Sequence, residues 1–169
     1  LSCYHCQFTL HMLFKNFYIV DKTKTNMYEV ELRALVNDFE DIKNRLKHGA
    51  DKTTINTIAI ENPKFITESS KIFGSQCIVV SIDVKKNEKN EYEVFSNYGK
   101  KPTGLNPVEW ARKVEELGAG EIFLNSIDRD GTGEGYDLEL IKLVSESVRI
   151  PVIACGGVGE FEDFAKGIT

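Results

Sequence analysis

The stretch that most constrains the fold is the run 77–83, Cys-Ile-Val-Val-Ser-Ile-Asp, which is rich in β-branched residues and ends in one carboxylate. Gly74 stands before it, and Lys85-Lys86-Asn87 follows it. A run this short and this apolar predicts a strand buried on both faces, as in a parallel sheet. Ligands of such sheets bind at the carboxyl ends of the strands, which makes Asp83 a candidate for chemistry. The alternative is that Asp83 only caps or turns the chain at a strand end.

Strands and helices are predicted to alternate after residue 37. Apolar runs predict strands over 51–57, 77–83, 121–128 and 151–154. Helical spacing, caps and glycine stops predict helices over 38–48, 63–73, 106–117 and 136–147, and another that begins at Phe161. The polar segment 87–98 alternates near its centre, which is typical of a small hairpin. Strict alternation with short connections predicts a parallel sheet.

The residues that follow the predicted strands distinguish between two parallel architectures. Each strand ends in small or polar residues, namely Asn56-Thr57, Asp83, Asp128 and Gly156-Gly157. This asymmetry is typical of the catalytic face of a (β/α)8 barrel. A doubly wound sheet usually carries a Gly-x-Gly-x-x-Gly fingerprint after its first strand, and the sequence has none. The predicted fold class is therefore α/β, a partial TIM (β/α)8 barrel. Four strands cannot close such a barrel, so we expect two exposed apolar edges.

Charge and hydropathy exclude several classes of function. The net charge of −5 argues against a general binder of nucleic acid or of membrane surfaces. No apolar run is long enough to span a bilayer. The segment 10–20 is not a secretory signal, because His11, Lys15 and Asn16 interrupt it and no small-residue cleavage site follows.

The four cysteines indicate a reducing compartment. Cys77 and Cys155 fall inside apolar strand predictions, so we expect buried free thiols. Cys3 and Cys6 form at best half of a zinc site, and no second such pair exists in the sequence. We therefore expect no metal, no other cofactor and a cytoplasmic location.

Glycine-rich turns at the strand ends point to phosphate binding. Asp130-Gly131-Thr132 and Gly156-Gly157 would present backbone N–H groups beside the positive end of the next helix. The loop 99–104 adds two lysines and the hydroxyl of Thr103. The alternative is that these glycines only make tight turns. Their recurrence at the same end of consecutive strands favours a phosphorylated substrate.

Several motifs, in order along the chain, resemble one known family. They are Gly49–Lys52, Ile55–Thr57, Glu61–Pro63, Phe73–Gln76, Val79–Asp83, Gly99–Lys101, Thr103-Gly104, Gly118–Glu121, Ser126–Thr132, Gly135–Asp137 and Pro151–Gly157. Together they resemble the cyclase subunit of imidazole glycerol phosphate synthase, from about residue 38 to residue 169. The chain then divides into an unmatched segment, 1–36, and a partial barrel, 37–169. That barrel would hold about strands 4–7 of the eight.

The resemblance implies an activity and a partner. Members of this family take ammonia from a glutaminase partner, a glutamine amidotransferase. They use it to split and cyclise a bis-phosphorylated substrate, giving imidazole glycerol phosphate and an aminoimidazole carboxamide ribotide. Two aspartates at strand ends serve as general acid and general base, and Asp83 matches the acid. No cofactor is implied.

The resemblance also assigns binding residues. Asn56 and Thr57 match substrate-contacting positions. The phosphate-side loops correspond to Gly99, Thr103, Asp130, Gly131, Gly156 and Gly157. Asp51, Lys52 and Glu121 lie near strand starts, where Lys52 and Glu121 match charged residues around the ammonia entrance beside the partner.

Departures from the family pattern leave alternatives open. The Cys-Leu-Asp type motif that carries the base is missing, and Asp21, after 17–20, is the only contender. Asn125 stands where the histidine enzyme commonly has Thr, and the segments 83–87 and 92–97 are closer to paralogues of surface-polysaccharide biosynthesis that channel ammonia onto a sugar. A third option is a non-catalytic scaffold that docks a glutaminase. The related isomerase ranks lower, because it lacks the motifs found at 118–121 and 126–132.

Overall fold

The computed structural model describes residues 18–20, 29–31 and 38–168. The chain forms two compact units, residues 1–53 and 54–169.

The described part of the first unit contains a short ribbon and one helix. Strand β1 (Tyr18–Val20) pairs antiparallel with β2 (Glu29–Glu31), with Tyr18 opposite Glu31. Asp21, the only contender for a general base, lies outside the described residues. Helix α1 (Phe39–Lys47) confirms the helix predicted over 38–48. The Asp38 carboxylate accepts the Asp41 N–H at 3.0 Å and so caps its first turn.

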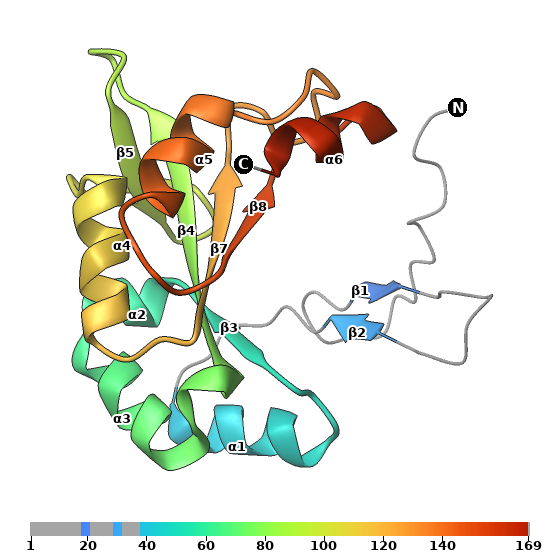
Figure 1. Ribbon diagram of the computed structural model, residues 1–169. Helices are drawn as coiled ribbons and strands as arrows, with labels where there is room; N and C mark the ends of the chain where they lie inside the picture. Colours follow the sequence, from blue (N-terminus) through green and yellow to red (C-terminus); the bar gives the residue numbers. More distant parts are fainter. Residues whose placement is uncertain (1–17, 21–28, 32–37, 169) are drawn as a thin grey trace. The chain divides into compact units, whose positions relative to one another are not determined.

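The second unit is built on an open sheet. Its strands are β4 (Ile78–Lys86), β5 (Tyr92–Ser96), β6 (Lys101–Pro102), β7 (Glu121–Ser126) and β8 (Val152–Cys155), in the order β6-β5-β4-β7-β8, and β3 (Thr53–Ile55) also pairs with β4. Strand β7 runs parallel to both β4 and β8 (Figure 1). This arrangement confirms the α/β class and the partial barrel, and the sheet is not closed.

The helices follow the predicted alternation. They are α2 (Thr57–Glu61), α3 (Lys64–Phe73), α4 (Pro107–Glu116), α5 (Leu138–Ser145) and α6 (Phe161–Gly167), with a 3₁₀ turn at Ser75–Cys77. Side-chain caps fix two of the starts: Asn106 accepts the Val108 N–H at 2.9 Å, and Asp137 accepts the Leu140 N–H at 3.1 Å. Helices α4 and α5 lie side by side against the sheet (Figure 1).

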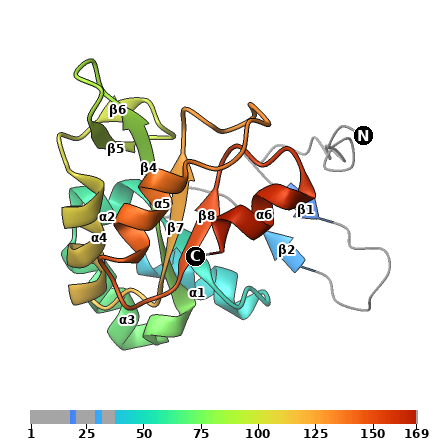
Figure 2. The same cartoon turned by 45° about the horizontal axis from the view of Figure 1, so that its top comes forward.

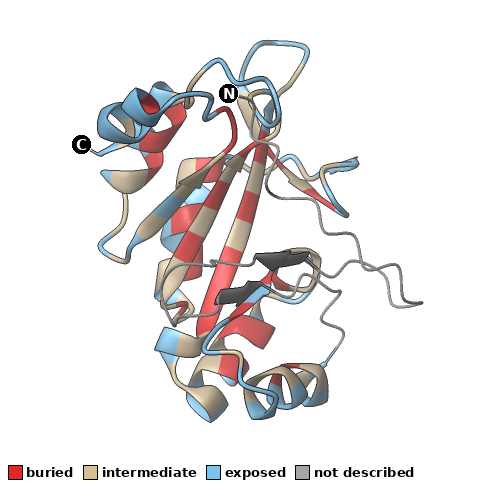
Figure 3. Ribbon diagram, turned by 90° about the vertical axis from the view of Figure 1, so that its right-hand side faces the viewer, coloured by how far each residue is buried: buried red, intermediate tan, exposed pale blue. Residues whose placement is uncertain are grey.

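The two faces of the sheet differ in burial. Val80, Ile82, Ile122 and Leu124 are at most 1% exposed, whereas Ser81, Asp83, Phe123 and Asn125, which alternate with them, are half-buried. Figure 3 shows this alternation of buried and intermediate residues along the strands. Because side chains alternate between the faces of a strand, the buried set packs under the helices and the other set forms a second face. We call this second face, formed by Ser81, Asp83, Phe123, Asn125, Ile153 and Cys155, the inner face.

The bounds predicted for the first two strands need correction. The strand expected over 51–57 is limited to Thr53–Ile55, because the Asn56 carbonyl accepts the N–H groups of Ala59 and Ile60 and starts α2 at Thr57. Strand β4 begins at Ile78, since Cys77 closes a turn onto the Gly74 carbonyl. It runs past Asp83 to Lys86, because β5 pairs antiparallel along Asp83–Lys86 in the expected hairpin (Figure 2).

The thiols also differ from expectation. Cys77 and Cys155 are half-buried, not buried. Cys77 lies in the 3₁₀ turn before β4, and Cys155 ends β8, the last strand in the sheet order. Fewer neighbours cover a side chain in these positions than in the middle of a sheet.

Candidate functional site

Three side chains form a row at the carboxyl ends of neighbouring strands. In register, Asp83 on β4 is paired with Asn125 on β7, and Asn125 is paired with Cys155 on β8. Paired residues point to the same face, so the row lies on the inner face. All three side chains are half-buried, and the Asn125 Oδ1 atom is buried without a hydrogen-bond partner. The row combines one carboxylate, one amide and one thiol.

A chain of hydrogen bonds links Asp83 to the two predicted substrate-contacting residues. The Ser81 hydroxyl donates to Asp83 Oδ1 at 3.0 Å, and Asn56 Nδ2 donates to the Ser81 carbonyl at 3.0 Å. The Thr57 hydroxyl donates to Asn56 Oδ1 at 3.3 Å and accepts the Asn97 N–H at 3.0 Å. The structure therefore brings Asn56 and Thr57 together with Asp83 and gives both side chains partners within the protein.

The loops after β7 and β8 contact each other. The Gly135 N–H donates to the Gly157 carbonyl at 2.7 Å, and the Asp130 N–H donates to the Ser126 carbonyl at 2.9 Å. Gly156 has φ +95°, and its Cα lies so close to β7 that an added Cβ would stand 2.6 Å from the Ser126 carbonyl oxygen. Four predicted phosphate-binding residues, Asp130, Gly131, Gly156 and Gly157, thus lie in two joined loops at one end of the sheet.

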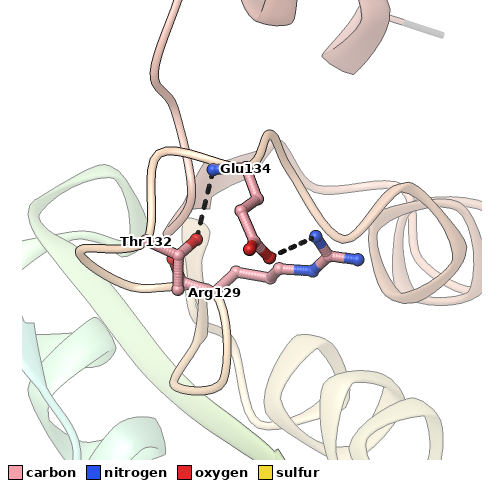
Figure 4. Close-up of polar contacts among 3 residues, drawn as sticks. All are labelled: Arg129, Thr132 and Glu134. Carbon is pink, nitrogen blue, oxygen red and sulfur yellow. Dashed lines mark hydrogen bonds and ion pairs between the residues drawn. The ribbon is translucent and has the colours of Figure 1, made fainter.

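The loop after β7 is also held by its own side chains. Thr132 donates its hydroxyl to the Arg129 carbonyl at 2.8 Å and accepts the Glu134 N–H at 3.2 Å (Figure 4). The Arg129 guanidinium pairs with the Glu134 carboxylate at 3.5 Å. These contacts order the loop next to Gly131, whose added Cβ would meet nothing within 4 Å.

The other two predicted phosphate-side residues lie in the turn between β5 and β6 and in the loop that follows β6. Gly99 ends a run of three left-handed residues, after Asn97 and Tyr98, and its added Cβ would stand 3.0 Å from the Ile127 side chain. The turn between β5 and β6 therefore lies against the segment after β7. The Thr103 hydroxyl donates to the Val94 carbonyl at 2.6 Å and accepts the Leu105 N–H at 3.2 Å. A phosphate at Thr103 would have to compete with these bonds.

The residues predicted at the ammonia entrance lie near strand starts. Asp51 and Lys52 are exposed and directly precede β3, in the first unit. Glu121, in the second unit, is half-buried and opens β7. It is four residues before Asn125, at the opposite end of the strand from the row.

Comparison with known families supports this architecture. Residues 15–169 match the family described as "Histidine biosynthesis protein". The chain belongs to this family. Its members are barrel enzymes of histidine biosynthesis, of isomerase and of cyclase type. The match begins inside the segment 1–36, and the domain boundary at residue 36 stays a prediction.

A cleft that the sequence did not predict lies between the β4–β5 hairpin and the start of α5. It has a volume of about 450 Å³ and is lined by Lys86, Tyr92, Asp128, Asp137 and Glu139, among others. The Tyr92 hydroxyl donates to Asp137 at 2.9 Å and to Glu139 at 3.3 Å, and the Lys86 ammonium stands 4.8 Å from the Tyr92 ring centroid. Tyr92 and Asp137 are 45 residues apart, and no local motif marks them as partners.

The Tyr92 contacts predict a pH-dependent loss of stability. Burial, followed by the hydrogen bond to Asp137, raises the pKa of Tyr92 above its usual value of 10.0. The stabilisation is therefore complete below pH 10 and declines as the pH rises above it, because the unfolded state then releases a proton that the folded state retains. We expect Tyr92→Phe to lower the free energy of unfolding by about 1 kcal/mol at pH 7. Urea unfolding at pH 7 and pH 10.5 should show a smaller gap between the two proteins at the higher pH. An equal gap at both pH values would contradict this interpretation.

Gly156 provides a test of the contact between the strand-end loops. We expect Gly156→Ala to destabilise the protein by about 2–3 kcal/mol, because the new Cβ meets the Ser126 carbonyl and the backbone is left-handed. Gly104→Ala is the matched control: it has φ +73° but nothing within 4 Å of the added Cβ, so only the backbone strain of about 1 kcal/mol remains. Urea unfolding measures both. Equal losses would show that the close approach to β7 contributes no stability.

Within the described part of the chain, no group of three or more His, Cys, Asp or Glu side chains is arranged to hold a metal ion. Among the same residues, no helix combines the length and the apolar character needed to cross a membrane.

Proposed function

We propose that the chain supplies the acid-bearing part of a cyclase-type lyase of the imidazole glycerol phosphate synthase kind. In this reaction ammonia attacks a bis-phosphorylated substrate, which is then split and cyclised to imidazole glycerol phosphate and an aminoimidazole carboxamide ribotide. Asp83 serves as the general acid. The two joined loops that contain Asp130, Gly131, Gly156 and Gly157 hold a phosphate group through backbone N–H groups.

The observation that carries this proposal is the position of Asp83 on the inner face. Its carboxylate accepts a hydrogen bond from Ser81 near the end of the part of β4 that pairs in parallel with β7. Asp83 lies there beside Asn125, at the same end of the parallel strands as the loops after β7 and β8. General acids need a fixed position near the reacting atom, and the ends of parallel strands provide it. Asn56 and Thr57, bonded into the same network, help to form this part of the site.

The proposal includes a partner and a compartment. A glutamine amidotransferase would deliver ammonia near Glu121, at the start of β7 in the second unit. A role for Asp51 and Lys52 of the first unit in ammonia entry belongs to the same proposal. Cys77 and Cys155 lie in the structure as thiols, which suits a reducing compartment, and we infer a cytoplasmic location. Phosphate binding by Gly99 and Thr103 belongs to the same proposal.

A second candidate is a paralogue that channels ammonia onto a sugar in surface-polysaccharide biosynthesis. Asn125 favours it, because an amide replaces the hydroxyl that the histidine enzyme commonly has beside the acid. A scaffold that docks a glutaminase without catalysing a reaction is a third option, and it predicts partner binding without cyclisation.

A completed barrel tests these options. Residues 38–169 would be placed between the first three strand–helix units and the last unit of a cyclase of this family, which restores the missing base. We expect turnover of the bis-phosphorylated substrate with ammonia. Failure to cyclise by a folded chimera that still stimulates a glutaminase would favour the scaffold or the sugar-amidating paralogue.

A further inference from the structure

We propose that Ser81 is a positioning residue that holds the Asp83 carboxylate in one orientation on the inner face. This inference rests on the proposed role of Asp83 as the general acid. The carrying observation is the 3.0 Å hydrogen bond from the Ser81 hydroxyl to Asp83 Oδ1.

Strand geometry places the two side chains together. Ser81 and Asp83 are two residues apart on β4, so both point to the inner face while Ile82 between them is buried on the other. The pairing of Ser81 with Phe123 and of Asp83 with Asn125 in β7 fixes the spacing along the strand. A short hydroxyl at this position reaches the carboxylate of the next residue on the same face.

The Ser81 backbone is fixed from outside its own strand. Asn56, between β3 and α2, donates to the Ser81 carbonyl, and Thr57 donates in turn to Asn56. The backbone N–H of Asn97, in the turn between β5 and β6, completes the series by donating to Thr57. Ser81 therefore connects Asp83 to a hydrogen-bond network that comes from three parts of the second unit.

An aspartate needs such a partner because rotation about its Cβ–Cγ bond gives the carboxylate no strongly preferred orientation. The torsion about its Cβ–Cγ bond is broad and two-fold, and the torsion about its Cα–Cβ bond can occupy several staggered wells, so an isolated carboxylate samples many orientations. The hydrogen bond to Ser81 requires one Cα–Cβ rotamer that brings the carboxylate to the hydroxyl. A hydrogen bond to a charged group is stronger than a neutral one and selects the orientations that keep it. Proton transfer depends on this geometry, since small misplacements lower the rate steeply. Ser81 would thus raise kcat without contacting the substrate.

The orientation can be measured in the full 169-residue chain. Three-bond couplings about the Asp83 Cα–Cβ bond, recorded by NMR on isotope-labelled protein, report whether the side chain keeps one rotamer. We expect one rotamer in the wild type, averaging in Ser81→Ala, and recovery in Ser81→Thr, which retains the hydroxyl and suits a strand. Ser69→Ala is the control, because Ser69 is a fully buried serine on α3 whose hydroxyl has no partner. Unchanged couplings in Ser81→Ala would overturn the proposal.

Kinetics in the completed barrel give a second and separate readout. We expect Ser81→Ala to lower kcat about tenfold with KM nearly unchanged, as for the loss of one orienting hydrogen bond to a charged group. Ser81→Thr should return most of that loss. Wild-type kcat in Ser81→Ala, beside an inactive Asp83→Asn, would overturn the role of Ser81 and leave the proposed function standing. A folded but inactive wild-type barrel would instead count against the proposed function, and the couplings would then decide whether Ser81 orients Asp83.

Discussion

Asp83→Asn in the completed barrel is expected to abolish cyclase turnover and to leave substrate binding largely intact. The amide keeps the size of the side chain and its ability to accept from Ser81, but it cannot donate a proton as an acid does. General acids typically contribute a factor of about 10²–10⁴ to the rate. Turnover with free ammonia measures the loss, and calorimetric titration with the bis-phosphorylated substrate measures binding.

Asp128→Asn is the matched control for this variant. Asp128 follows the carboxyl end of β7, and Asp83 lies near the end of the parallel part of β4. The Asp128 carboxylate, however, accepts the Lys86 N–H and lines the cleft beside α5. We expect turnover within a few-fold of the wild type. Near wild-type turnover by Asp83→Asn would show that Asp83 is structural.

The second large effect concerns the 169-residue chain by itself, for which we expect no cyclase activity. The reaction requires a general base as well as an acid, and the family places that base on the first strand of the barrel. The only contender is Asp21, which follows β1. However, β1 pairs antiparallel with β2 in a two-stranded ribbon, and the parallel strands belong to a separate sheet. A first barrel strand would be expected to lie parallel to its neighbours.

An assay of the purified chain with ammonia and the bis-phosphorylated substrate decides this prediction. Asp21→Asn is the informative variant, because it removes the remaining candidate for the base. Measurable turnover that Asp21→Asn eliminates would contradict the prediction and would assign the base to Asp21.

The sequence alone determined the order and the kind of most elements. The alternation of apolar runs with capped helical segments is local chemistry: Asp38, Asn106 and Asp137 cap helices in the structure as their residue types suggest. The position of Asp83 near the end of the parallel part of β4 followed in the same way, because strands of a parallel sheet are apolar up to the point where they meet solvent. The expectation that this strand is buried on both faces was only partly met, since Ser81 and Asp83 on the inner face are half-buried. The family resemblance came from motifs spread over the same region.

Only the tertiary structure decided which groups meet. The register that aligns Asp83 with Asn125 and Cys155 depends on how β4, β7 and β8 pair, and local sequence does not encode it. The same holds for the bond from Asn56 to the Ser81 carbonyl, across 25 residues, and for the pairing of Tyr92 with Asp137. The extension of β4 to Lys86 also depended on a distant partner. The polar residues at the end of β4 are in a strand because β5 pairs with them. Propensity acts over a few residues, whereas these contacts arise only when distant segments pack together. The sequence therefore predicted where Asp83 lies on its strand but not the network that holds it.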